Sequence, residues 1–260
     1  MNIQDKVVII TGASSGIGRA TAVAAAEAGA NVVLVARREE RLINLAKELE
    51  KRDGERLIIV GDIRQAAFAS DILQKTIAKL GRVDVLINNA GLGHRSLLVD
   101  MPPDDMQTLW ETNVLGMLYI TQSCMKQMLK QGQGQIVNVS SIVGQRPLPN
   151  SALYCASKSA MNFISRSLRM ECKAYNIKVT TIYPGLTQTE FGLVRLGKKG
   201  VNRFGLKGIP PERVAKKIVQ AMQNGNNEVY VTWYDWLFVQ LNRHFPRTFD
   251  WIAARGSHLA

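Results

Sequence analysis

The chain has 260 residues, of which 46% are hydrophobic and 21% are charged, and this is typical of a globular protein with one large domain. The formal net charge of +12 suits anionic partners, but no helix-turn-helix, zinc-finger or RNA-binding signature accompanies it, so we expect no nucleic acid among the partners. No stretch approaches roughly 18 consecutive apolar residues, which argues against a transmembrane helix.

Apolar, β-branched runs alternate with segments of helical spacing along the chain. The predicted strands cover 6–11, 31–36, 56–61, 83–88, 134–140, 177–183 and 227–232, and the predicted helices cover 16–28, 39–52, 65–80, 104–130, 152–175 and 210–224. Short runs that are apolar throughout are typical of strands buried on both faces of a sheet. The alternation therefore predicts an α/β fold with a parallel sheet between two layers of helices. No linker or internal repeat divides the chain, so we expect a single domain over residues 1–260.

The first predicted strand ends in a glycine-rich loop with the sequence TGASSGIG. Gly12 permits a tight turn, Gly16 lets the backbone approach a pyrophosphate, and Gly18 allows the next helix to pack closely on the strand. Free N–H groups at the start of that helix would meet the phosphates. We therefore expect a dinucleotide site, and its loop residues are Gly12, Ser14, Ser15, Gly16, Ile17 and Gly18.

The end of the second predicted strand indicates which dinucleotide binds. An acidic residue at that position would accept hydrogen bonds from both ribose hydroxyls and repel a 2′-phosphate. This chain has Ala36 there, followed by Arg37 and Arg38. Since a guanidinium can form a paired, charge-assisted contact with a phosphate, we expect NADP(H) as cofactor and assign Arg37 to its 2′-phosphate. Arg38 is either a second contact or a solvated charge at the start of the next helix.

Tyr154 and Lys158 are four residues apart on a predicted helix, so their side chains lie on one face. Reduction of a carbonyl group needs a proton donor for the oxygen while hydride arrives at the carbon. A free tyrosine has a pKa of about 10. A nearby cation, together with the positive charge of an oxidised nicotinamide, favours the tyrosinate. We therefore expect Tyr154 to act as acid and base, with its pKa lowered by Lys158.

Taken in order, these segments resemble the short-chain dehydrogenase/reductase family. The resemblance rests on the GxxxGxG spacing of the loop, Asn88–Gly91, Asn113, Ser141, the YCASK segment from Tyr154 to Lys158, and Pro184-Gly185, and it spans about residues 5–190. It implies a three-layer Rossmann fold with seven parallel strands in the order 3-2-1-4-5-6-7. It also implies reversible reduction of a ketone or aldehyde, here with NADPH. Homodimers and homotetramers are frequent in this family, so we expect a homo-oligomer.

The resemblance further implies the roles of single residues. Ser141 would hold and polarise the substrate oxygen, Lys158 would also hydrogen-bond the nicotinamide ribose, and Asn113 would support a water that relays protons to Lys158. Ser140 is adjacent, but the family arrangement places two residues and then a glycine, here Gly144, after the catalytic serine.

More cofactor contacts follow from the same resemblance. They are Asp62, Ile63, Asn89, Ala90, Gly91, Tyr154, Lys158, Pro184, Gly185, Thr187 and Thr189. Asp62 and Ile63 would hold the adenine ring, and Thr187 and Thr189 would face the carboxamide and the phosphates. Two positions depart from the family pattern: many NADPH enzymes carry a basic residue where Ser15 stands, and an aliphatic residue is frequent where Thr187 stands.

Two segments fall outside the strand–helix rhythm. Residues 185–209 are rich in glycine and in Lys and Arg, and they occupy the place of the family's substrate lid. Their charges are either solvated or guide an anionic substrate. Residues 230–260 form an aromatic-rich extension, for which we favour a packed C-terminal helix over a weak peripheral membrane contact. Either interpretation suits a lipophilic substrate.

Other function classes remain open on the sequence. The chain could reduce 3-oxoacyl thioesters carried by an acyl carrier, or serve as a non-catalytic NADPH sensor, although such sensors typically lose the tyrosine or lysine that this chain keeps. A peripheral membrane scaffold is a third class. Because Cys124, Cys155 and Cys172 are scattered without ligand spacing, we expect no metal site and no disulfide framework. The first residues show no secretory-signal pattern, so we expect a cytoplasmic protein.

Overall fold

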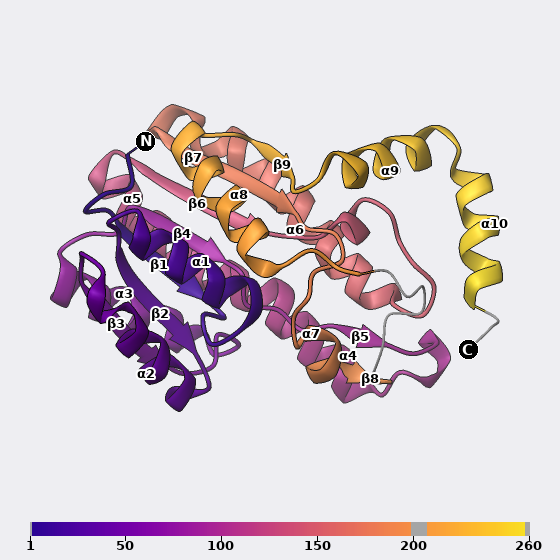
Figure 1. Ribbon diagram of the computed structural model, residues 1–260, viewed down its shortest axis with the longest axis horizontal. Coiled ribbons are helices and arrows are strands. Elements are labelled where there is room, and N and C mark those ends of the chain that lie inside the picture. Colours follow the sequence, from indigo (N-terminus) through magenta and orange to yellow (C-terminus); the bar gives the residue numbers. More distant parts are fainter. Residues whose placement is uncertain (1, 199–206, 258–260) are drawn as a thin grey trace.

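Within residues 2–198 and 207–257, which the computed structural model describes, seven strands form one parallel sheet (Figure 1). In spatial order they are β3 (Arg56–Val60), β2 (Asn31–Ala36), β1 (Val7–Thr11), β4 (Val85–Asn88), β6 (Gly134–Val139), β7 (Ile177–Tyr183) and β9 (Glu228–Tyr230). The predicted order 3-2-1-4-5-6-7 is confirmed, because β5 (His94–Arg95) and β8 (Leu196–Gly197) pair with each other in a separate small sheet and shift only the numbering.

Helices cover both faces of this sheet, as predicted. They are α1 (Gly16–Glu27), α2 (Glu39–Glu48), α3 (Ala66–Leu80), α4 (Pro103–Trp110), α5 (Gly116–Gln131), α6 (Ala152–Glu171), α7 (Phe191–Val194), α8 (Pro211–Asn224), α9 (Trp233–His244) and α10 (Pro246–Ser257). One hydrophobic cluster joins the sheet to α1, α2 and α8, and a second joins it to α3, α5 and α6. The three layers of a Rossmann fold are therefore present.

Successive residues of each strand serve the two clusters in turn. In β1, Val8 and Ile10 belong to the cluster with α1 and α8, whereas Val7 and Ile9 belong to the cluster with α3 and α5. Both faces of the strand are thus buried, which explains why the strand sequences are apolar without alternation.

The predicted helix 104–130 is divided into two. After α4 ends at Trp110, residues Glu111–Leu115 form a π-helical turn, and α5 begins at Gly116. A π turn holds one extra residue, and hydrophobic spacing alone does not reveal it. Such turns are frequent at functional sites, and this one contains Asn113.

The carboxyl ends of the parallel strands meet at one edge of the sheet. The glycine loop follows β1, the Asn89–Gly91 segment follows β4, Ser141 comes shortly after β6, and Pro184 directly follows β7. The fold therefore brings these separated motifs to a common edge.

The last two helices extend the chain away from this edge. In Figure 1, α9 and α10 project beyond the body of the molecule; α9 contacts β9, and α10 contacts α9. Among the described residues, no helix combines the length and the apolar content needed to cross a bilayer.

Candidate active site

The glycine loop after β1 has a backbone that side chains would obstruct. Gly12 and Gly16 lie in the left-handed region, with φ of 69° and 53°. A Cβ on Gly18 would lie 2.3 Å from the carbonyl oxygen of Gly12, so the start of α1 approaches the loop as closely as expected. A Cβ on Gly16 would lie 3.0 Å from Thr189, which places the loop beside the segment that follows β7.

The start of α1 leaves its first N–H groups available. Ser15 occupies the N-cap position but makes no side-chain capping hydrogen bond, and no acidic residue lies in the first turn. The first turn of a helix with free N–H groups attracts anions. This end of α1 can therefore receive a phosphate group. Ile17, in the same turn, packs partly buried against the cluster that includes α1.

The hydroxyl group of Thr11 ties the loop to the end of β4. It accepts hydrogen bonds from the backbone N–H groups of Asn89 (3.0 Å) and Ala90 (3.1 Å) and donates to the carbonyl oxygen of Ile87 (3.2 Å). The Asn89 amide in turn donates to the carbonyl oxygen of Thr11 at 3.0 Å. Thr11 was not among the predicted site residues, and its only sequence signal is a hydroxyl at the end of the first strand.

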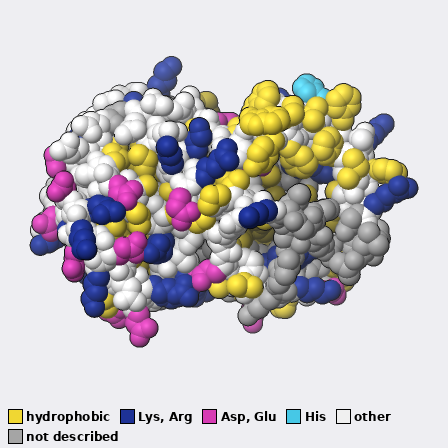
Figure 2. Space-filling model, viewed as in Figure 1, with side chains coloured by type: hydrophobic (Ala, Val, Ile, Leu, Met, Phe, Trp, Pro, Cys, Tyr) yellow, Lys and Arg dark blue, Asp and Glu magenta, His cyan; other side chains and the backbone are white. Residues whose placement is uncertain are grey.

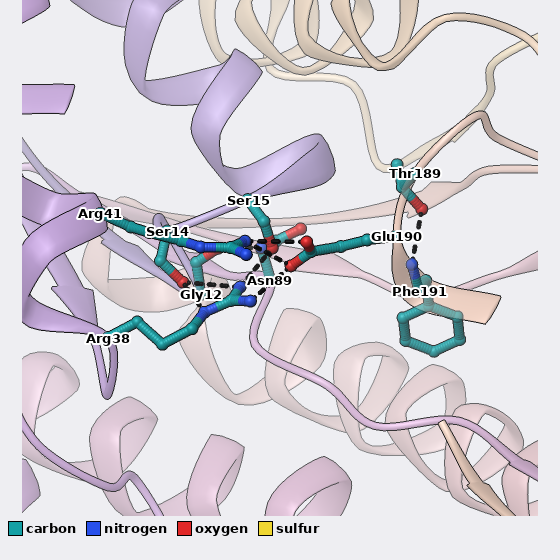
Figure 3. Close-up of polar contacts among 9 residues, drawn as sticks. All are labelled: Gly12, Ser14, Ser15, Arg38, Arg41, Asn89, Thr189, Glu190 and Phe191. Atoms are coloured by element: carbon teal, nitrogen blue, oxygen red, sulfur yellow. Dashed lines mark hydrogen bonds and ion pairs between the residues drawn. The ribbon is translucent and has the colours of Figure 1, made fainter. Parts of the chain in front are cut away.

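Arg38, rather than Arg37, lies over the glycine loop (Figure 3). Its Nε and Nη2 donate to the hydroxyl of Ser14 at 3.2 and 3.0 Å, and Nη2 also donates to that of Ser15 at 2.7 Å. The Arg37 side chain is 68% exposed, and its nearest carboxylate, on Asp62, is 3.9 Å away. The geometry therefore favours Arg38 for the anion contact that the sequence assigned to Arg37.

Glu190 brings a carboxylate to the same place. It accepts from Arg38 Nη1 at 2.5 Å, and both of its oxygens accept from Arg41 Nη1 at 2.8 Å (Figure 3). The hydrogen bonds from Arg41 and, less strongly, Arg38 outweigh burial and lower the pKa of Glu190 to about 2. Sequence reasoning missed Glu190 and Arg41, because the two residues are 149 positions apart and only the fold joins them.

A cavity of about 380 Å³ lies beside this cluster. It is lined by the glycine loop, by α1 and α2, and by the segment that follows β7, including Ser15, Arg41 and Glu190. Arg41 and Glu190 therefore face a space that a ligand can enter.

Asp62 and Ile63 follow β3 on the same side of the sheet. Asp62 accepts from the backbone N–H of Arg64 at 3.0 Å and from its Nε at 2.9 Å. Burial opposes ionisation of Asp62, but the hydrogen bonds from Arg64 outweigh it and hold the pKa of the carboxyl below its usual value. Ile63 is buried against Gly116, where a Cβ would lie 2.9 Å from Ile63 Cγ1.

Tyr154 and Ser141 meet although they come from different elements. Ser141 precedes a short helical turn after β6, while Tyr154 lies in the first turn of α6, and their side chains lie close enough for Ser141 to affect the pKa of the phenol. The Ser141 hydroxyl also lies 3.3 Å from the carbonyl oxygen of Pro184. The neighbouring Ser140 is buried and donates to Asn162 at 2.6 Å, so its hydroxyl is occupied within the core. Of the two serines, Ser141 is thus the one beside Tyr154.

Lys158 is buried beneath Tyr154 on the same helix. Its Nζ donates to the carbonyl oxygen of Val139 at 2.9 Å, and burial lowers the pKa of the ammonium from 10.5 to about 8. A Cβ on Gly91 would lie 3.6 Å from Lys158 Nζ and 3.4 Å from Asn113 Oδ1. Gly91 therefore lies between the lysine and the asparagine, close to both.

The Asn113 side chain is fully buried and uses both ends of its amide. Nδ2 donates to the carbonyl oxygen of Leu92 (2.9 Å) and to the hydroxyl of Ser157 (3.0 Å), while Oδ1 accepts from the Leu92 N–H (2.7 Å). The π turn thus locks Asn113 against the segment after β4 and against α6.

The expected decrease in the pKa of Tyr154 is not produced by the protein alone. Burial raises the pKa of the Tyr154 phenol, Cys155 adds to the increase, and the nearby Ser141 only partly offsets it. In this structure the Lys158 ammonium lies against a backbone carbonyl group. The phenol therefore keeps its proton at neutral pH.

The segment after β7 joins the site to α9. A Cβ on Gly185 would lie 2.3 Å from Asp235 Oδ1, so α9 packs directly against this turn. Thr187 donates to the Gly185 carbonyl oxygen at 3.1 Å, and the Thr189 hydroxyl accepts from the N–H of Phe191 at 3.3 Å. The predicted lid, residues 185–209, is described at 185–198 and 207–209, and its residues 199–206 lie outside the described ranges.

His94 lies near the site but is enclosed. It is buried in β5, its Nε2 is 3.6 Å from Asp105, and burial lowers its pKa.

Comparison with known proteins gives a consistent picture. The profile of the short chain dehydrogenase family matches residues 6–195. The chain is 38% identical over 218 residues to an uncharacterised oxidoreductase of Thermotoga maritima, covering 84% of this chain and 82% of the relative. It is 34% identical over 227 residues to a 3-oxoacyl-(acyl-carrier-protein) reductase of the same species, covering 84% and 91%. Among solved structures, an alcohol dehydrogenase of Thermococcus sibiricus in complex with 5-hydroxy-NADP is similar, with a TM-score of 0.78 and 27% identity over 87% of this chain and 96% of that one.

Proposed function

The chain belongs to the short-chain dehydrogenase family of oxidoreductases, and from this we propose that it is an NADPH-dependent reductase of a lipophilic ketone or aldehyde that also oxidises the alcohol. The observation that carries the proposal is the meeting of Tyr154, Ser141 and Lys158 at the carboxyl edge of the sheet, beside the glycine loop. The remaining steps concern the cofactor, the proton and the substrate.

The residues at this edge fit a nicotinamide dinucleotide, which would supply the hydride. Gly12 and Gly16 remove side chains where a pyrophosphate would approach, and the free N–H groups of α1 would bind its oxygens. The Lys158 ammonium lies close to Gly91 in the segment after β4, where the nicotinamide ribose would lie. Asp62, Ile63, Ala90 and the segment from Pro184 to Thr189 would line the rest of the cofactor.

Three features support NADPH over NADH. Position 36 lacks a carboxylate, Arg38 already binds the loop hydroxyls, and Glu190 shows that Arg38 and Arg41 together accept an anion. A 2′-phosphate would replace the Glu190 carboxylate against Arg38. The related alcohol dehydrogenase of Thermococcus sibiricus was solved with an NADP derivative.

The proton would come from Tyr154. Its raised pKa keeps the phenol protonated for reduction, and Ser141 would donate a second hydrogen bond to the same substrate oxygen. For the reverse reaction, the phenol must become acidic, and the positive charges of Lys158 and of an oxidised nicotinamide would favour this. Asn113 would hold the proton relay to Lys158 in place.

Apolar side chains around the tyrosine support a lipophilic substrate. The Phe191 ring lies 5.7 Å from that of Tyr154 between centroids, and Leu148, Leu186 and Leu193 are exposed on neighbouring segments. A substrate carbonyl between Tyr154 and Ser141 would thus have an apolar approach.

An acyl-carrier-linked 3-oxoacyl thioester is the second candidate. The 34% identity to a reductase of such substrates favours it, as do the basic residues Arg195, Lys198 and Lys207 in the described part of the lid. A phosphopantetheine-linked substrate carries the anionic charge that such residues attract.

The test is NADPH oxidation against a panel of medium-chain ketones and aldehydes and one 3-oxoacyl thioester, repeated with NADH. We expect turnover of at least one carbonyl compound and preference for NADPH. A clear preference for the thioester would select the second candidate. Tight NADPH binding without turnover of any compound would instead indicate a cofactor sensor. Sedimentation velocity on the same sample tests the homodimer or homotetramer that we also propose.

A further inference from the structure

The outer face of α9 is apolar over most of its length. From Trp233 to Leu241, every residue that is exposed is aromatic or aliphatic: Trp233, Tyr234, Trp236, Leu237 and Leu241. The opposite face is buried through Asp235 and Val239. Trp233 alone is 72% exposed. A helix of a monomeric protein normally places charged side chains on its solvent side, so this face requires a partner.

The apolar surface continues onto α10. Phe245, at the junction of the two helices, and Trp251 and Ile252 are also exposed. Figure 2 shows the hydrophobic side chains gathered at the end of the molecule where α9 and α10 project. Three of the chain's four tryptophans lie on these two helices.

The charges around this surface are cationic. Arg243, Arg247 and Arg255 are exposed along it, and the Arg255 guanidinium lies 3.7 Å from the centroid of the Trp251 ring. The two carboxylates of α9 and α10 each have a partner within the protein: Asp235 is buried with Thr232, and Asp250, whose side chain is 69% exposed, pairs with the buried Arg146 at 3.2 Å. The surface therefore combines tryptophan, tyrosine and arginine, the residues that suit the boundary between lipid tails and anionic headgroups.

We propose that α9 and α10 dock this protein on an anionic lipid surface. The tryptophans and Phe245 enter the boundary between headgroups and acyl chains, and the arginines bind lipid phosphates. A second copy of the chain is a poorer occupant. In a two-fold symmetric contact the same patch meets itself, so two surfaces that each carry Arg243, Arg247 and Arg255 would be brought together and would repel.

The docking surface is joined to the candidate active site at two points. Asp235 packs against Gly185 at the start of the lid, and Asp250 pairs with Arg146, which lies in the segment between Ser141 and Tyr154. Docking would therefore hold the substrate side of the site near the lipid. This last consequence rests on the proposed reductase function, whereas the docking does not.

The test is flotation of the full chain with vesicles at low salt, using phosphatidylcholine alone or mixed with phosphatidylglycerol. We expect the protein to float with the mixed vesicles only, to dissociate at high salt, and to show a blue shift of tryptophan fluorescence on binding. The double variant W233S/W236S should reduce the bound fraction by about tenfold. R243Q/R247Q should also lower it and weaken its salt dependence.

The matched control is F163S on α6, which removes a side chain that is 70% exposed elsewhere on the molecule and should float like the wild type. Thermal melting of each variant checks that it folds. Wild-type protein that stays unbound, or W233S/W236S that floats unchanged, would overturn the proposal. So would a wild-type dimer that W233S/W236S converts to a monomer, because the surface would then be a subunit interface. Flotation is independent of turnover, so failure of the reductase assay leaves this result intact.

Discussion

Glu190 is the residue on which the proposed cofactor selection turns. Its carboxylate lies between Arg38 and Arg41, beside the hydroxyl groups of Ser14 and Ser15 (Figure 3). The 2′-phosphate of the proposed NADPH would need the same guanidinium groups, so the carboxylate and the phosphate would compete. Since Glu190 directly precedes α7, this competition would also connect cofactor binding to the start of the lid.

Replacing Glu190 by glutamine should therefore tighten NADPH binding. Because an ion pair between partly exposed groups is worth roughly 1 kcal/mol, we expect the Kd for NADPH to fall about fivefold while that for NADH changes little. E212Q lines the same cavity and is the matched control. Fluorescence titration measures both dissociation constants. Equally weakened binding of NADPH and NADH in E190Q would contradict the prediction and would show that Glu190 instead stabilises the conformation of the loop.

The two adjacent arginines give a second prediction. A hydrogen bond to a charged group contributes about 1.5–3 kcal/mol, so R38Q should raise the Kd for NADPH by roughly ten- to a hundredfold. R37Q, at an exposed side chain, should change it by less than a few-fold, and neither variant should affect NADH much. The reverse ranking would restore the assignment that the sequence suggested.

Lys158 sets the expected pH dependence. Burial lowers the pKa of its ammonium to about 8, so the charge is present below that pH and is lost as the pH rises through it. If the ammonium is needed, kcat/KM for carbonyl reduction should fall about tenfold per pH unit above this value. In K158R the guanidinium stays charged, so any residual activity should lack this decline. An unchanged pH profile in K158R would assign the titration to another group.

At the scale of the elements, the parallel sheet followed from the alternation of short apolar strands with helices, whereas the strand order followed from the resemblance of the ordered motifs to the short-chain dehydrogenase/reductase family. The π turn around Asn113 did not follow, since one extra residue in a turn barely changes the helical pattern. The ion pair between Glu190 and Arg41 was also not predicted from the sequence, because the two residues lie far apart in the chain. Motif chemistry is local, whereas charge pairing depends on the finished fold.

The close packing between the loop after β1 and the start of α1 can be tested by replacing Gly18 with alanine. In G18A the new Cβ would lie 2.3 Å from a backbone oxygen, so the loop must shift and NADPH binding should weaken by at least about tenfold. G132A, at the end of α5, meets open space but has φ of 69°. It should cost about 1–2 kcal/mol of stability and leave NADPH binding unchanged. Titration and urea unfolding separate the two effects, and a G18A protein that binds NADPH normally would contradict the close packing.

At the scale of the whole molecule, charge and apolar surface are both uneven. Residues 195–260 carry 11 Lys and Arg against 4 Asp and Glu, and the same region contains the exposed aromatic face of α9. From the sequence we favoured packing of this extension over membrane contact. In the structure α9 packs on the protein through its other side, which includes Asp235 and Val239, and this leaves its apolar face exposed. Periodicity alone could not show which face of an apolar helix would remain outside.

The central claim is that the Tyr154 phenol gives its proton to the substrate oxygen as hydride arrives. The most direct measurement is single-turnover oxidation of enzyme-bound NADPH by an accepted carbonyl substrate, followed by absorbance, for the wild type and Y154F. The account predicts unchanged NADPH binding in Y154F and a hydride-transfer step slower by roughly a hundred- to ten-thousandfold. Hydride transfer in Y154F at the wild-type rate would contradict it.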